Sequence, residues 1–206
     1  GADNSKSPNV LASVERAPIN ADGSLGSWQG MPALSTARMG FALVANESYV
    51  WVLGGQGTSG ALATAERAEI RPDGSIGPWQ NAGSVPARAY PAALVVGDSI
   101  FYLGGSDTTT VFRIPILSGG SLDTAVAQPS LLNKRSSPKV FQAGTHLYVT
   151  AGEDYSGGAI NGWRTTERAL LEFKLISNSA ESKHEPSSPV TQVWGHQFGS
   201  EDDWVA

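Results

Sequence analysis

The chain of 206 residues contains no cysteine and no cluster of basic residues. Without cysteine it can form neither disulfides nor thiolate metal sites, and it has no cysteine nucleophile. Its 14 basic residues are outnumbered by 19 acidic residues, which gives a net charge of −5. Non-specific binding of nucleic acid requires a cationic surface, so we do not expect a nucleic-acid partner.

Long apolar runs are absent as well. No run approaches the roughly 18 apolar residues of a membrane-spanning helix, so no membrane span is predicted. Residues 1–10 (GADNSKSPNV) do not have the pattern of a signal peptide. No apolar spacing of 3.6 residues is found either, which argues against long helices.

Instead, the chain is rich in glycine (24 residues) and contains an internal repeat. Residues 14–28 (VERAPINADGSLGSW) match residues 65–79 (AERAEIRPDGSIGPW) at an offset of 51 positions. Residues 33–55 match residues 84–105, and residues 133–152 form a weaker third copy. A period near 50 residues is typical of repeat architectures such as propellers.

Each repeat is predicted to contain four short strands separated by turns rich in Gly, Asn, Asp, Ser and Pro. In one repeat the strands are expected at residues 41–45, 49–55, 64–70 and 77–81. The second strand is continuously apolar, which is typical of a strand covered on both faces.

These motifs resemble kelch-type β-propellers, particularly divergent bacterial ones. The resemblance rests on an arginine before the first strand, an apolar second strand ending in Gly-Gly, and a DGS(L/I)G turn leading to tryptophan. It implies an all-β fold of four-stranded antiparallel blades, about three and a half of them, within a propeller of six or seven blades. After an N-terminal extension (1–13), the units are expected around residues 14–37, 38–87, 88–134 and 135–176.

The C-terminal part does not continue the repeat clearly. Residues 177–190 are polar and rich in Ser and Pro, as in a linker or long loop. Residues 191–206 are open to two interpretations. They supply a fourth strand, with Trp194 in the role of Trp28 and Trp79, or they begin a repeat resembling that of another bacterial, seven-bladed propeller family.

Residues that could carry chemistry are few. The three histidines (His146, His184 and His196) lack a nucleophile elbow and a metal-binding spacing. The acidic clusters at Glu153-Asp154 and 201–203 lack the pattern of a calcium loop, so they are interpreted as solvated turn charges. We therefore predict no catalytic residue, no metal site and no cofactor.

Features that recur in every unit are interpreted as architectural. Arg38, Arg88 and Arg135 occupy equivalent positions, and these arginines and the Glu-Arg pairs are expected to form ion pairs that link strands or blades. The aspartate of each DGS turn should accept backbone N–H bonds, while the following glycine supplies a positive φ. Four aromatic side chains are expected to be buried between blades: Trp28, Trp79, Trp51 and Phe101.

The function expected from the resemblance is recognition of a protein or glycan through blade loops, without catalysis. The alternatives are a fragment of a carbohydrate-active propeller enzyme (sialidase or sugar mutarotase-like) and a structural subunit of a surface assembly. Few lysines and no cysteine suit a secreted or cell-surface bacterial protein. Because about three and a half blades cannot close a ring, further blades are expected from the same parent chain or another copy.

Overall fold

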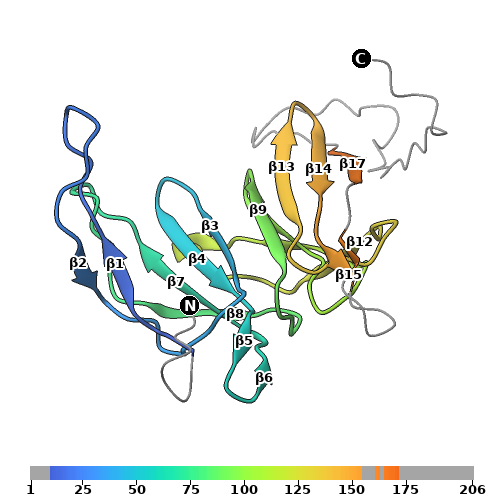
Figure 1. The fold of residues 1–206 in the computed structure, drawn as a ribbon, viewed down its shortest axis with the longest axis horizontal. Helices are drawn as coiled ribbons and strands as arrows, with labels where there is room; N and C mark the ends of the chain where they lie inside the picture. Colours follow the sequence, from blue (N-terminus) through green and yellow to red (C-terminus); the bar gives the residue numbers. More distant parts are fainter. Residues whose placement is uncertain (1–9, 155–160, 163–164, 172–206) are drawn as a thin grey trace, which may run out of the picture.

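The computed structural model describes residues 10–154, 161–162 and 165–171, and this part of the chain is all-β. Four antiparallel sheets follow one another in chain order, and we call them units 1 to 4 (Figure 1). Each sheet is a simple meander in which consecutive long strands pair. The all-β expectation is confirmed, and none of the described sheets closes on itself.

The strands are assigned as follows. Unit 1 holds β1 (Val14–Arg16) and β2 (Gln29–Met31). Unit 2 holds β3 (Ala42–Ala45), β4 (Tyr49–Leu53), β7 (Thr64–Glu69) and β8 (Gln80–Ser84). Unit 3 holds β9 (Ala92–Val96), β10 (Ser99–Leu103), β11 (Val111–Pro115) and β12 (Val126–Gln128). Unit 4 holds β13 (Lys139–Ala143), β14 (His146–Thr150) and β17 (Thr166–Leu170).

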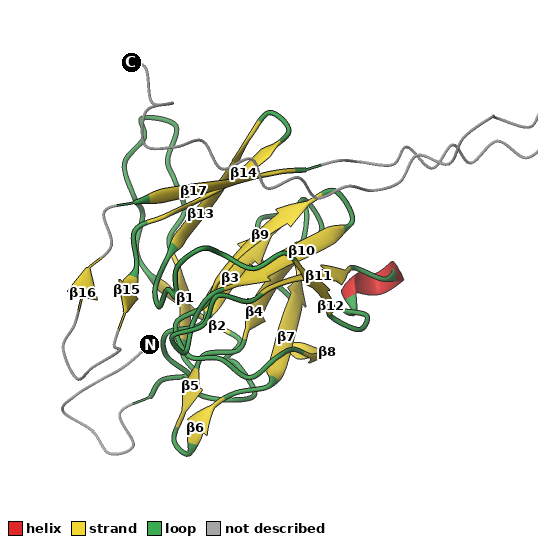
Figure 2. Ribbon diagram, turned by 90° about the vertical axis from the view of Figure 1, so that its right-hand side faces the viewer, coloured by secondary structure: helices red, strands yellow, loops and turns green. Residues whose placement is uncertain are grey.

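Smaller elements lie between the long strands. Two hairpins are formed by β5 (Gln56–Gly57) with β6 (Gly60–Ala61), and by β15 (Glu153–Asp154) with β16 (Asn161–Gly162). The short 3₁₀ helix η1 (Ser118–Gly120) is the sole helix in the described part of the chain (Figure 2). No helix there is long and apolar enough to cross a bilayer.

Three of the four strands predicted for unit 2 lie where the sequence places them, but the fourth does not. It was expected at residues 77–81 and begins instead at Gln80. The preceding residues form a closed turn, in which Ile70 bridges Ile76 and the Gly77 N–H donates to the Glu69 carbonyl. Pro78 follows directly and has no N–H for a ladder, so pairing resumes only after it.

The core lies between the sheets rather than within one of them. A first cluster of buried side chains joins units 2 and 3 and contains Trp51, Leu53, Ile100 and Tyr102. A second cluster joins units 3 and 4 through the other face of β10. Strand β10 is therefore covered on both sides, which explains its continuous apolar sequence.

Neighbouring units are also tied by their backbones. The first strands β3, β9 and β13 lie beside one another, so the units meet along their first strands. The Gly55 N–H of unit 2 donates to the Arg88 carbonyl of unit 3, and the Gly105 N–H of unit 3 donates to the Arg135 carbonyl of unit 4. The repeat in sequence is thus a repeat of contacts between units.

The predicted burial of four aromatic residues holds for Trp51 and Phe101, which are 0% and 4% exposed. It is wrong for Trp28, which is 66% exposed. The nearby side chains of Ile19 and Leu25 are exposed as well. Trp79 is half-buried, and its indole N–H donates to the Pro32 carbonyl of unit 1. Trp28 has no such neighbour, because no described unit lies on that side of unit 1.

Several expectations lie outside the described residues. They concern the linker at 177–190, the two interpretations of 191–206, and the side chains of His184, His196 and residues 201–203. Of the predicted extension at 1–13, residues 10–13 are described. The Leu34 N–H donates to the Ala12 carbonyl as the Val85 N–H does to Ala63, so these residues already follow the repeat.

Candidate functional site

The repeated arginines are structural elements of each unit. In unit 2, Arg38 is fully buried, and its Nη2 lies 2.7 Å from the Oε1 atom of Glu66. Its Nη1 donates to the carbonyl oxygens of Gly54 and Thr64. One guanidinium therefore joins the turn before β3 to the ends of β4 and β7, and the expected ion pair is confirmed in this unit.

Unit 4 repeats this arrangement. Arg135 is fully buried and pairs with Glu167 at 2.8 Å, while its Nη1 donates to the Ala151 carbonyl. In both units the carboxylate also accepts backbone N–H bonds from the segment before the arginine. The donors are Ser35 and Thr36 for Glu66, and Leu132 and Asn133 for Glu167. Such a fully bonded pair leaves no group for a ligand.

Unit 3 departs from this arrangement because Phe112 stands where the other units carry glutamate. Arg88 donates to the Gly104 carbonyl and to the hydroxyls of Thr108 and Thr110, and its guanidinium lies 5.3 Å from the Phe112 ring centroid. Burial lowers the pKa of Arg88. The segment before the arginine differs in unit 3 as well. There Val85 is followed by Pro86, which has no N–H to donate to a carboxylate.

The Gly-Gly turns are required by close packing. A Cβ atom on Gly55 would lie 2.8 Å from the Met39 carbonyl of its own unit, whereas one on Gly54 would lie 2.9 Å from the Arg88 carbonyl of the next unit. All four glycines of the two pairs, Gly54-Gly55 and Gly104-Gly105, have positive φ. The second glycine thus allows close packing within its own unit, and the first glycine allows close packing against the next unit. Because packing explains both glycines, these pairs are not interpreted as phosphate loops.

The DGS turns are also structural, as predicted. The Ser24 and Ser75 backbone N–H groups donate to Asp22 and Asp73 at 2.9 Å. Ser24, through its hydroxyl and its N–H, lowers the pKa of Asp22, and Ser75 beside the Asp73 carboxylate lowers the pKa of Asp73. Gly23 and Gly74 adopt positive φ.

The remaining sequence candidates do not converge. His146 is half-buried on β14, with its ring 6.2 Å from that of Tyr148. Glu153 and Asp154 were expected to be solvated turn charges, but they form the half-buried strand β15 and pair in the backbone with Asn161–Gly162. Nowhere in the described ranges do three metal-ligating side chains gather.

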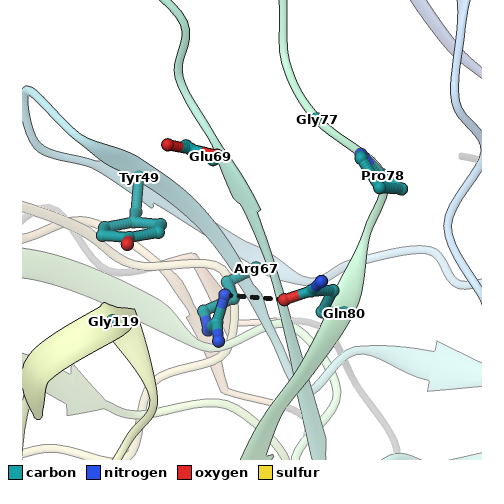
Figure 3. A pocket seen from close by; sticks show the side chains of 7 residues that line it. All are labelled: Tyr49, Arg67, Glu69, Gly77, Pro78, Gln80 and Gly119. Carbon is teal, nitrogen blue, oxygen red and sulfur yellow. Dashed lines mark hydrogen bonds between the residues drawn. The ribbon is translucent and has the colours of Figure 1, made fainter.

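A hollow of about 280 Å³ lies where unit 2 meets the η1 turn of unit 3. Its walls come from the start of β4, the end of β7, the start of β8 and the η1 turn (Figure 3). Its lining residues are Tyr49, Arg67, Glu69, Gly77, Pro78, Gln80 and Gly119. Figure 3 shows Tyr49 and Gln80 on either side of Arg67, with Glu69 and Pro78 at the other end of the hollow.

Arg67 is held in place by two neighbours. Its Nη1 donates to the Gln80 amide oxygen at 3.0 Å, and its guanidinium carbon lies 5.5 Å from the centre of the Tyr49 ring. Its Nε is buried and has no hydrogen-bond partner among the described residues. Few buried donors in folded proteins lack a partner.

Sequence reasoning missed this hollow because it interpreted every repeated feature, including the Glu-Arg strands, as architectural. Arg67 does repeat, as Arg16, Arg113 and Arg168. However, Tyr49 corresponds to Ser99 in unit 3, and Glu69 corresponds to Pro115. The signal that could have found the site is the departure of unit 2 from its own repeat next to a repeated arginine.

Comparison with known proteins gives a distant structural likeness. No protein-family model matches the chain, and no curated protein matches its sequence. A solved structure titled "Structure of YjhT" superposes with a TM-score of 0.55 at 16% sequence identity. The match covers 72% of this chain and 47% of that one, so the chain spans just under half of the length of YjhT. This likeness concerns the fold alone.

Proposed function

We propose that the protein is a recognition module without catalytic activity, built from kelch-like propeller blades, that binds a glycan or protein through the loops of its blades. Support for the blades comes from consecutive four-stranded sheets whose first strands lie together. In a propeller the first strands surround the central axis. The repeated contacts between units at Gly55 and Gly105 support the same arrangement.

The observation that carries the binding role is the hollow beside Arg67. The repeated arginines before the first strands are saturated by protein groups in units 2 and 4. In contrast, the hollow combines an arginine, a glutamate, an amide and an aromatic side chain. Two of these residues, Tyr49 and Glu69, are not repeated in unit 3. Function on repeat scaffolds resides in such local departures, since the fold itself does not define an activity.

Location outside the cytoplasm is part of the proposal. The chain has 5 lysines, 9 arginines and no cysteine, a composition that suits a secreted or cell-surface bacterial protein. Detection of the native protein in the culture medium or on intact cells by antibody labelling tests this point. Its recovery only from the cytosol would overturn it.

The two ends of the array support a second role, which is assembly with further blades. Ile19, Leu25 and Trp28 are 78%, 60% and 66% exposed at one end, and Phe141 is 47% exposed at the other. Ile19 and Leu25 are bridged to each other, and adjoining exposed apolar groups of this kind mark contact surfaces. Further blades of the same parent chain, or another copy, are the partners we propose for them.

A glycan array tests the recognition role directly. The purified chain should bind a subset of immobilised glycans, and heat-denatured chain should not bind them. Release or conversion of the bound glycan during incubation would show an enzyme instead. If no glycan is retained, glycan recognition is excluded and only the protein-binding form of the proposal remains, which crosslinking to proteins of the cell surface then tests.

A further inference from the structure

The hollow beside Arg67, in the described part of the chain, has chemistry specific enough to name a ligand class. We propose that the hollow between β7, β8 and Tyr49 binds one neutral sugar ring through its hydroxyl groups. The inference rests on the proposed recognition function and names its site and ligand class. It assigns the binding to Arg67, Glu69 and Gln80.

The charges in the hollow favour a neutral ligand. Arg67 and Glu69 both line it, two residues apart on β7. An anionic ligand placed near Arg67 would also meet the Glu69 carboxylate, and a cationic ligand placed near Glu69 would meet the guanidinium. A hydroxyl group avoids this conflict, because it donates to a carboxylate and accepts from a guanidinium.

Hydrogen-bonding groups in the hollow remain available for a ligand. Gln80 accepts from Arg67 through its oxygen, and no described group accepts from its amide nitrogen. The Glu69 side chain is exposed and lines the hollow, and its carboxylate accepts no hydrogen bond that the structure shows from a described residue. Donors and acceptors therefore lie on opposite sides of one space, as adjacent sugar hydroxyls require.

The walls are rigid enough to orient these groups. Gly120 lies so close to Tyr49 that a Cβ atom would approach the ring to within 2.9–3.0 Å. Arg67 lies near the same ring, so Tyr49 is fixed between unit 3 and the guanidinium. The nearby Trp51 indole also donates to the Gly120 carbonyl at 2.7 Å. Such preorganisation lowers the entropic cost of binding.

Size limits the ligand to a single ring. At about 280 Å³, the hollow is at the lower end of small-molecule sites. A ligand with about a dozen heavy atoms in a partly open site binds in the millimolar range. The site would therefore recognise one residue of a longer glycan, with avidity supplied by repeated presentation.

The test is a titration of the full chain, followed by NMR chemical shifts, with glucose, galactose, mannose and N-acetylglucosamine as probes. At least one probe should bind in the millimolar range. Glu69→Ala and Gln80→Ala should each weaken that binding at least tenfold. Both side chains are exposed, so the fold should persist, and an unchanged unfolding midpoint verifies this.

Matched controls are Glu47→Ala and Gln142→Ala, which remove the same groups from exposed positions outside the hollow. They should leave the affinity unchanged. Glucuronate serves as a charged probe, and it should bind more weakly than glucose because its carboxylate meets Glu69. Tighter binding of glucuronate, enhanced by Glu69→Ala, would overturn the inference in favour of an anion site.

The outcomes separate this inference from the function on which it rests. If array glycans bind but both hollow variants retain full affinity, the site is wrong and glycan recognition stands. The same holds if array glycans bind while none of the four sugars shifts a resonance of the hollow. If neither the array nor the titration shows binding, glycan recognition itself fails.

Discussion

Strands β10 and β14 occupy the same place in their units but have different surroundings. Every residue of β10 (Ser99–Leu103) is buried, because units 2 and 4 cover its two faces. In β14 (His146–Thr150) buried and half-buried residues alternate, with only Leu147 and Val149 fully buried. The comparison teaches that burial in this array is decided by the neighbouring unit and not by the strand itself.

The glycine pairs show the same difference. A Cβ atom on Gly104 of unit 3 would approach the Arg135 carbonyl of unit 4 to 2.8 Å. The equivalent position in unit 4 is Ala151, which already carries a Cβ atom at a φ of 56°. Gly152, which approaches its own unit, is retained. The first glycine, which packs against the next unit, is thus replaced by Ala151 in unit 4, where no described unit follows. The second glycine, which packs within its own unit, is kept as Gly152.

The largest contrast is expected between two tryptophans. Trp51→Ala should lower the free energy of unfolding by about 3–5 kcal/mol, because it removes a fully buried ring between units 2 and 3. Trp28→Ala should change it by no more than about 0.5 kcal/mol, since that ring is exposed. Urea unfolding of the two variants measures both. Equal losses would mean that Trp28 is covered in solution, for instance by another copy.

The stability lost when the buried arginine loses its carboxylate should not depend on where the unit lies in the array. Glu66→Ala and Glu167→Ala should each cost about 3 kcal/mol, because each leaves a fully buried arginine without its carboxylate. Phe112→Leu is the matched change in unit 3 and should cost less than about 1.5 kcal/mol. The same unfolding experiment decides. A much smaller loss for Glu167→Ala would show that unit 4 is loosely formed throughout.

The glycine comparison gives an intermediate effect. Gly104→Ala should destabilise by about 2 kcal/mol, because alanine is strained at positive φ and its Cβ approaches unit 4. Ala151→Gly should change the stability by less than about 1 kcal/mol, as relief of strain is offset by a more flexible unfolded chain. Thermal unfolding of both variants is the measurement. A strong gain from Ala151→Gly would indicate that a close neighbour lies against unit 4.

The smallest effect is expected on the dependence of stability on acidic pH. Ser75, whose backbone N–H donates to the Asp73 carboxylate, holds the folded-state pKa of Asp73 below its usual value of 3.8. Because a lowered pKa stabilises the fold only while the group is ionised, this contribution is complete above about pH 4 and disappears as pH falls through the folded pKa. The unfolding midpoint of Asp73→Ala should therefore depend less on pH below 4 than that of the unaltered chain. Asp22→Ala should reduce the pH dependence of the midpoint in the same way. A different pH dependence in the two variants would show that the unit in which an exposed turn lies affects its aspartate.

Much of the architecture could be predicted because it is local and repeated. The Asp–Gly turns at 22–23 and 73–74 depend on backbone conformation and neighbouring hydrogen bonds, and they form as expected. The exchange of glutamate for Phe112, together with Pro86, was visible in the sequence but not interpretable. Its meaning depends on a carboxylate and two backbone N–H donors that lie about 30 positions apart in units 2 and 4.

The sequence by itself determined the all-β class, the repeat, most of the strands of unit 2 and the Asp–Gly turns, because these depend on residue spacing and local conformational preference. Tertiary structure alone decided which aromatic rings are buried, since Trp28 and Trp79 have the same local sequence and different neighbours. It also decided where the candidate site lies. The hollow gathers Tyr49, Glu69 and Gly119 from two units, and no spacing along the chain encodes the distance between two packed sheets.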